Sequence, residues 1–128
     1  MATGFPASTG DVLSAAMFNG LVTFTINPQS GSTYTVANTD LYQALVQTTN
    51  ASTKTVTIAP DSTLTSAATG SAITFLNTGA GLLTFAAGSG VTITSAGATS
   101  AAPTLAQYKS CVAIRTGSNA WTIVGAIG

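Results

Sequence analysis

The sequence of 128 residues contains no histidine, no glutamate and only one cysteine. Charged residues make up 5% of the chain, against about 25% in an ordinary soluble domain. The three acidic and three basic residues balance to a formal net charge of zero. A single cysteine permits no internal disulfide, and without histidine it cannot complete the usual zinc sites. Stability therefore has to come from packing or from assembly with other subunits.

The shortage of basic residues also limits the partners of the chain. Nucleic-acid binding needs clustered lysine and arginine, and here three such residues are spread along the sequence. An anionic membrane surface is disfavoured for the same reason, and no apolar run approaches the roughly 20 residues that span a bilayer. The first residues lack the basic start and apolar stretch of a signal peptide, which indicates synthesis in the cytoplasm. We predict neither a nucleic-acid nor a membrane partner.

The most frequent pattern in the sequence is an apolar–Thr–apolar triplet. It begins at residues 22, 34, 56, 73, 83, 91 and 121. A period of two, with β-branched and aromatic members, indicates half-buried strands. Residues 44–48 and 108–116 fit strands less regularly. Glycine, asparagine, serine and proline between these segments predict turns, and residues 94–103 predict an exposed loop or a crossing connection.

These patterns predict an all-β fold, an antiparallel β-sandwich that is jelly-roll-like, over residues 21–128. Residues 1–20 are expected to form an arm (1–10) and a short helix (12–18) with Asp11 as its N-cap. A β-solenoid is the alternative, disfavoured because the triplets begin at irregular intervals. The expected inner face of the sandwich consists of Val22, Phe24, Ile26, Val56, Ile58, Ile73, Phe75, Leu83, Phe85, Val91, Ile93, Val112, Ile114, Trp121 and Ile123.

The glycine-rich stretch NTGAGLLTFAAGSGVTITS, residues 77–95, could in principle hold a phosphate. A dinucleotide loop needs G-x-G-x-x-G between a strand and a helix. Thr84 and Ile93 stand where the third glycine belongs, and no lysine follows as in a P-loop. Strand pattern, not helix, follows both clusters. We therefore expect these glycines to turn the chain between neighbouring strands.

The chain offers few groups for catalysis. Without histidine and glutamate, acid–base chemistry would fall on aspartates in turn or capping positions and on lysines, of which Lys54 is expected to be solvated. We predict no enzyme activity, no cofactor and no metal site, with calcium held by loop carbonyls and aspartate as the open alternative. Trp121 lies within a triplet and is expected in the core or an interface, as is Cys111. An alternative role for the aromatic residues is a sugar platform, formed by Trp121, Tyr34, Tyr42 and Tyr108.

Two parts of the sequence resemble proteins of bacteriophage particles. The segment GDVLSAAMFN, residues 10–19, resembles a G-x-x-L-[ST]-A-A-x-x-N stretch near the start of many phage fibre and virion proteins. From residue 34 onward, VTIAP, GAGLLTF, GVTITS and WTIVG follow in an order similar to that of a β-rich domain of tail-fibre and capsid-associated proteins. One departure is IAP around Pro60, where VPP or IPA is usual. This resemblance covers about three quarters of the chain and carries no catalytic residues.

The resemblance implies a structural protein of the virion, made in the host cytoplasm. A domain standing almost alone, without a shaft, favours a trimeric capsid decoration (cement) protein on the outer capsid surface. Its partner would be the major capsid protein, and the low charge and open sheet edges of the chain also favour a homotrimer. A short head or tail fibre, with receptor or glycan binding, is the alternative. The expected capsid anchor consists of apolar residues outside the triplet pattern, namely Phe5, Pro6, Leu13, Met17 and Phe18.

Overall fold

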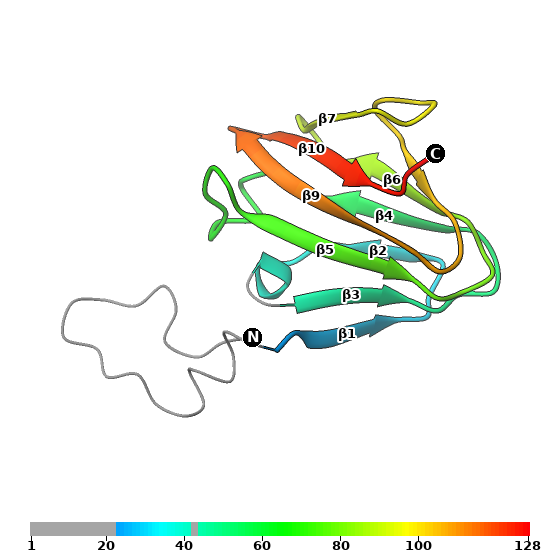
Figure 1. Cartoon of the computed structure of the whole chain (residues 1–128). Coiled ribbons are helices and arrows are strands. Elements are labelled where there is room, and N and C mark those ends of the chain that lie inside the picture. The colour runs from blue at the N-terminus through cyan, green and yellow to red at the C-terminus, as the bar shows by residue number, and fades with distance from the viewer. Residues whose placement is uncertain (1–22, 42–43) are drawn as a thin grey trace.

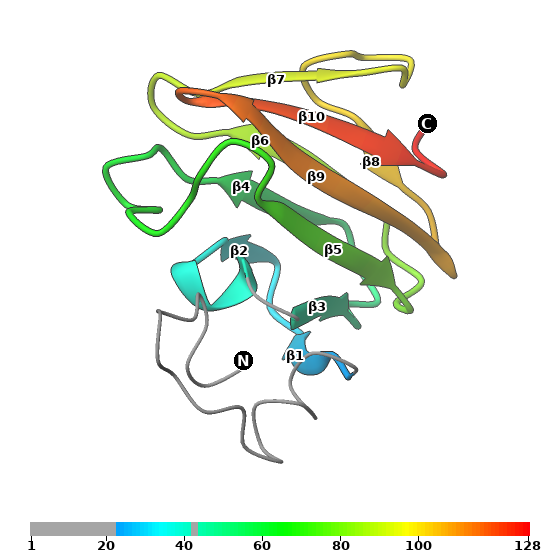
Figure 2. The ribbon, with the colours of Figure 1, turned by 60° about the vertical axis from the view of Figure 1, so that its left-hand side comes forward.

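The computed structural model describes residues 23–41 and 44–128, which form two layers of β-sheet (Figures 1 and 2). The first sheet has six strands in the order β1-β3-β5-β9-β10-β7, and the second has four in the order β2-β4-β6-β8. The first consists of β1 (Thr25–Gln29), β3 (Ala44–Thr48), β5 (Ala72–Asn77), β9 (Lys109–Gly117), β10 (Ala120–Gly125) and β7 (Thr92–Ser95). The second consists of β2 (Thr33–Thr35), β4 (Lys54–Ile58), β6 (Leu83–Ala87) and β8 (Thr104–Leu105).

Successive strands alternate between the two sheets, so the first part of the chain winds as a coil. β1, β3 and β5 pair in parallel in one sheet, and β2, β4 and β6 pair in parallel in the other. β9 then returns antiparallel to β5, and β10 to β9, while β7 pairs in parallel with β10. The sheets are therefore mixed and not antiparallel as predicted, and the coil does not confirm jelly-roll-like connections.

The coil has turns of unequal length, which explains why its repeat is not visible in the sequence. β1, β3 and β5 begin at residues 25, 44 and 72. The second turn carries the long connection 59–71 between β4 and β5, whereas the first carries a short 3-10 helix, η1 (Asn38–Leu41). The irregular intervals between the triplets disfavoured a solenoid in the sequence analysis. A coiled winding requires the strands to stack, however, and the loops between them can differ in length. The predicted crossing connection, 94–103, does join β7 to β8 in the other sheet.

The inner faces of both sheets share one hydrophobic core. Phe75 and Phe85 meet edge to face across it, with ring centroids 4.9 Å apart. Nine residues of the predicted inner face are confirmed as buried: Val56, Ile58, Ile73, Phe75, Leu83, Phe85, Ile93, Trp121 and Ile123. Val91 is partly buried against this core. Val22, like the predicted arm and helix, lies outside the described residues.

Four residues that were predicted to face the core do not lie in it. In β9 the buried residues are Cys111 and Ala113, whereas Val112 and Ile114 lie half-buried on the outer face. The register with β5 decides this, because Cys111 and Ala113 stand opposite the inward-pointing Phe75 and Ile73. The large side chains of Phe75 and Ile73 on β5 thus have small residues as their neighbours on β9. Phe24, just before β1, and Ile26, within it, were also predicted to be buried but are exposed.

The glycine-rich turn between β5 and β6 packs directly onto the turn between β3 and β4. A Cβ atom on Gly79 would lie 2.2 Å from the carbonyl oxygen of Asn50, and one on Gly81 only 1.7 Å from that of Ser52. The amide of Gly81 donates a hydrogen bond to the Asn50 oxygen at 3.0 Å. These glycines do turn the chain, but between sheets and not in hairpins. Their missing side chains allow successive corners of the coil to stack.

Candidate interaction surfaces

The predicted anchor residues Phe5, Pro6, Leu13, Met17 and Phe18 lie outside the described residues. The described chain begins at Thr23, immediately before two exposed apolar side chains. Phe24 is 53% exposed and Ile26 is 50% exposed. Ile26 points outward because it stands opposite the half-buried Leu45, whereas Asn27 stands opposite the fully buried Val46. This pair of apolar side chains borders an uncharged part of the surface.

Among the strands that the structure describes, β1 lies at the edge of the first sheet, with β3 as its neighbour. The amide of Thr49 donates to the carbonyl of Gln29 at 3.1 Å, so the backbone of Gln29 and Asn27 faces β3. The backbone of Ile26 and Pro28 therefore faces the open edge, and proline supplies no N–H there. The missing N–H of Pro28 makes the addition of another strand at this edge less favourable. A partner at β1 would contact side chains in preference to pairing with the backbone.

A buried carboxylate fixes this edge to the rest of the molecule. Asp40, in η1, is 1% exposed and accepts hydrogen bonds from the Tyr34 hydroxyl (2.5 Å), the Asn27 amide (2.9 Å) and the Ala37 backbone amide (2.9 Å). The pKa of Tyr34 is raised above its ordinary value. Burial is the largest cause, and the hydrogen bond to Asp40 and the negative charge of Asp40 add to it. Asp40 thus joins β1, β2 and η1, whereas the sequence indicated only an ordinary turn residue at this position.

A shallow hollow of about 320 Å³ lies between β1 and η1, beside the buried carboxylate. Its lining is formed by Thr25, Ile26, Asn27, Thr39, Asp40 and Ala44. Because the Asp40 oxygens are already occupied by three donors, the hollow presents mainly hydroxyl, amide and apolar groups. It extends the apolar surface of Ile26 toward η1.

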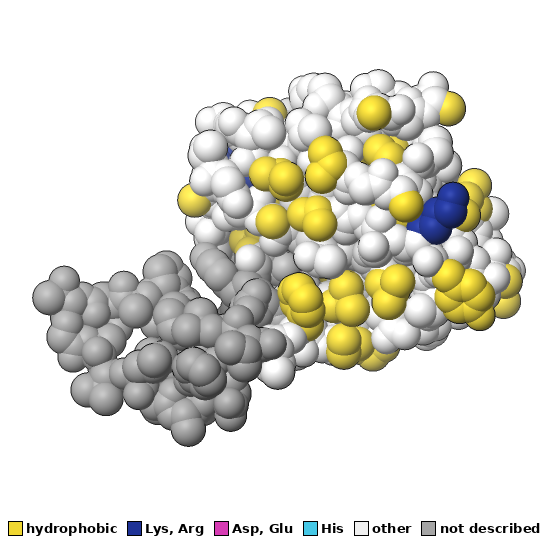
Figure 3. All heavy atoms as spheres, in the orientation of Figure 1, with side chains coloured by type: hydrophobic (Ala, Val, Ile, Leu, Met, Phe, Trp, Pro, Cys, Tyr) yellow, Lys and Arg dark blue, Asp and Glu magenta, His cyan; other side chains and the backbone are white. Residues whose placement is uncertain are grey.

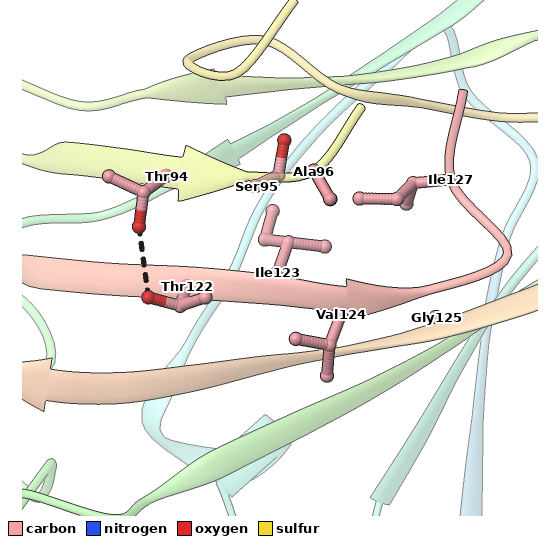
Figure 4. Close-up of a pocket in the computed structure, with 8 residues that line it drawn as sticks. All are labelled: Thr94, Ser95, Ala96, Thr122, Ile123, Val124, Gly125 and Ile127. Carbon is pink, nitrogen blue, oxygen red and sulfur yellow. Dashed lines mark hydrogen bonds between the residues drawn. The ribbon is translucent and has the colours of Figure 1, made fainter. Parts of the chain in front are cut away.

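A second hollow, which we call the β7–β10 groove, lies where β7 leaves β10. Its volume is about 440 Å³, and it is lined by Thr94, Ser95, Ala96, Thr122, Ile123, Val124, Gly125 and Ile127. Figure 4 shows the side chains of Ala96, Ile123 and Ile127 converging on this space. The hydroxyls of Thr94 and Thr122 are joined by a hydrogen bond of 2.9 Å at its rim. The lining is therefore largely apolar and carries no charge.

Three of the four other charged residues in the described ranges make side-chain hydrogen bonds within the fold: Lys54, Asp61 and Arg115. Lys54 was predicted to be solvated, but it is 2% exposed and donates from Nζ to the Gly31 carbonyl. Lys54 shares the inward face of β4 with Val56 and Ile58, and burial lowers its pKa. Hydrogen bonds from Arg115, at 2.7 and 3.2 Å, hold the pKa of Asp61 below its usual value.

The described aromatic residues of the alternative sugar platform, Trp121, Tyr34 and Tyr108, do not form a shared exposed surface, because Trp121 is buried. Trp121 is buried in the core, as predicted, and its Nε1 has no hydrogen-bond partner among the described residues. The Tyr34 hydroxyl donates a hydrogen bond to Asp40, and Tyr42 lies outside the described residues. Cys111 is also buried, and desolvation raises the pKa of its thiol to about 12. The thiol therefore stays protonated and unreactive at neutral pH.

The surface itself is poor in charge. Figure 3 shows one face of the molecule, with the backbone and the other uncharged side chains in white, separate yellow groups of hydrophobic side chains and little blue. Within residues 23–41 and 44–128, no group of three or more potential metal ligands from His, Cys, Asp and Glu is found. The same ranges contain no helix long and apolar enough to cross a membrane.

Comparison with known proteins adds no family to this description. No family model, no curated protein and no solved structure matches the chain. Of the features that could form contacts, the sequence indicated apolar character at residues 24 and 26 but placed it inside the fold. The β7–β10 groove carries no sequence signal, because it depends on where two strands distant in sequence separate.

Proposed function

We propose that this chain is a non-enzymatic structural protein of a bacteriophage particle, and specifically a decoration (cement) protein that binds and stabilises the capsid. In this proposal the two sheets form a sandwich, three copies assemble as a homotrimer, and the major capsid protein is the partner. The segment that contains Phe5, Pro6, Leu13, Met17 and Phe18 anchors each copy to the outer capsid surface. The proposal begins from the resemblance of residues 10–19 and 34–128 to phage virion proteins.

The exposed apolar pair at the β1 edge is the observation that carries this proposal. Phe24 and Ile26 lie next to the predicted anchor in sequence, and both expose about half of their side chains. Neighbouring exposed apolar side chains favour contact with a partner, because covering them removes apolar surface from water. The nearby edge is blunted by Pro28, so it suits a side-chain contact with a shell protein and resists uncontrolled strand pairing.

Deleting residues 1–19 is expected to leave a folded β-domain that no longer binds capsids. The described residues contain their own hydrophobic core, so folding does not need the deleted segment. The measurement is occupancy on undecorated particles by co-sedimentation, with circular dichroism to check the fold. A Phe24→Ser/Ile26→Ser variant should weaken binding by about tenfold, because truncation of an interface anchor costs more than 1 kcal/mol.

Leu82→Ser provides the matched control, since Leu82 is also an exposed large apolar residue but lies before β6. This variant should bind capsids like the wild type. Full occupancy by the truncated protein would show that the anchor is assigned to the wrong residues. Equal losses for Leu82→Ser and for the Phe24/Ile26 variant would show that the β1 edge has no special part in binding.

A further inference from the structure

Tyr108 combines a strained backbone with an exposed ring. Its φ angle is +62°, and the only other non-glycine residue with positive φ among those described is Asn119, a type that tolerates this region. Its side chain is 75% exposed. Bulky residues in the left-handed region are conformational outliers and occur mostly where function compensates for their strain.

The backbone around Tyr108 is held firmly in this conformation. The Tyr108 amide donates to the Asn77 carbonyl at 2.5 Å, and the Lys109 amide donates to the Ala106 carbonyl at 3.3 Å. The side chain of the preceding residue, Gln107, donates to the Thr78 carbonyl at 3.1 Å. Asparagine or glycine would satisfy the same backbone at lower conformational cost. The fold therefore fixes the backbone from which an aromatic ring extends into solvent, where its own core gains little from it.

The β7–β10 groove has the size and chemistry to receive such a ring. A volume of about 440 Å³ accommodates a phenol side chain with room for neighbouring atoms. Ala96 and Ile127 offer accessible apolar contact, and the hydroxyls at the rim can bond to a phenol hydroxyl. Since Tyr108 is largely exposed, it does not fill the groove of its own molecule. The same chain thus carries a projecting ring and an apolar groove that the ring of its own copy does not occupy.

We infer that Tyr108 of one copy docks into the β7–β10 groove of a second copy of this chain. A projection on one copy and a hollow on the next make a heterologous contact, the kind that closes rings. No charge would be buried, because the groove lining contains no charged residue, and Lys109 next to the ring can remain at the solvated rim. This inference rests on the proposed homotrimer and names the contact that holds it together.

The first test replaces the ring and measures self-association by sedimentation equilibrium. Tyr108→Gly and Tyr108→Asn should weaken association by about 30-fold or more, as expected for a central aromatic anchor. Their melting temperatures, measured in dilute protein, should not fall, because both residues suit a positive φ. Tyr108→Phe should associate nearly like the wild type. A Tyr108→Gly variant that associates as tightly as the wild type would overturn the inference and leave the trimer standing.

The second test blocks the groove and then mixes variants. Ala96→Asp places a charge in the groove and should abolish self-association, whereas Ala98→Asp, an equal change on the same exposed loop outside the groove, should not. Tyr108→Gly keeps an intact groove and Ala96→Asp keeps an intact ring. An equimolar mixture should therefore form heterodimers that neither variant forms alone.

Each other outcome of the mixing test contradicts the inference. A mixture that stays monomeric would show that ring and groove do not contact each other. Equal effects of Ala96→Asp and Ala98→Asp would show that added charge, and not the groove, controls association. A wild-type protein that is monomeric at tens of micromolar would overturn both this contact and the trimer, while capsid binding, measured separately, would still test the proposed function.

Discussion

Replacing Gly81 by alanine is expected to destabilise the fold by about 3 kcal/mol or more, at the upper end of the cost of overpacking. The new Cβ would lie 1.7 Å from the Ser52 carbonyl oxygen, which belongs to the backbone and cannot rotate away. Gly81 is also fixed on both sides, since its amide donates to Asn50 and its carbonyl accepts from the Asn77 side chain. Either the two corners separate or hydrogen bonds between them break.

Gly117→Ala is the matched control for this substitution. Gly117 ends β9, its φ is not in the left-handed region, and an added Cβ would meet no atom within 4 Å. We expect its free energy of unfolding to stay within about 0.5 kcal/mol of the wild type. Urea denaturation measures both variants. Equal stability of Gly81→Ala and Gly117→Ala would contradict the stacking of the corners.

Replacing Asp40 by alanine should cost about 3 kcal/mol and loosen the β1 edge. The substitution leaves the Tyr34 hydroxyl, the Asn27 amide and the Ala37 amide without their acceptor. An unsatisfied buried polar group costs about 1 to 3 kcal/mol, and water entering the adjacent hollow recovers part of the total. Urea denaturation gives the loss in stability, and hydrogen exchange of β1 amides should increase.

Two further variants separate this network from a general packing effect. Asp40→Asn retains one acceptor oxygen and should lose less stability than Asp40→Ala. Tyr34→Phe should alter the response to alkali, because the pKa of Tyr34 is raised in the folded state above its ordinary value of 10.0. The contribution of this group is complete below about pH 10 and declines as the pH rises further. An unchanged pH dependence in Tyr34→Phe, or full stability of Asp40→Ala, would contradict the network.

The position of most strands could be predicted from the triplets, because alternation with a period of two survives in any sheet. β4, β5, β6 and β10 each contain such a triplet, and the less regular segment 44–48 coincides with β3. The first triplet, residues 22–24, did not predict a strand correctly, because β1 begins only at Thr25. The inward positions of β1 carry Asn27 and Gln29. Their amides belong to the Asp40 network, so a polar interior replaced the apolar one expected.

The topology and the contact surfaces could not be obtained in this way. Pairing partners are set by contacts distant in sequence, and a strand pattern does not state whether its neighbour is parallel. Lys54 illustrates the limit, because alternation alone places it on the buried face of β4 although its charge suggests solvent. Tyr108 gave no signal either, since positive φ is normally marked by glycine or asparagine.

An image of the virus particle tests the central claim most directly, namely that this chain is a capsid decoration protein. Electron cryomicroscopy of particles with and without the protein would locate the additional density. We expect density at many equivalent positions on the outer capsid surface, each of a size that fits three copies. Density confined to the tail or to a single vertex would contradict a capsid decoration protein and favour a fibre. Failure to detect the protein in purified wild-type particles would contradict any virion function.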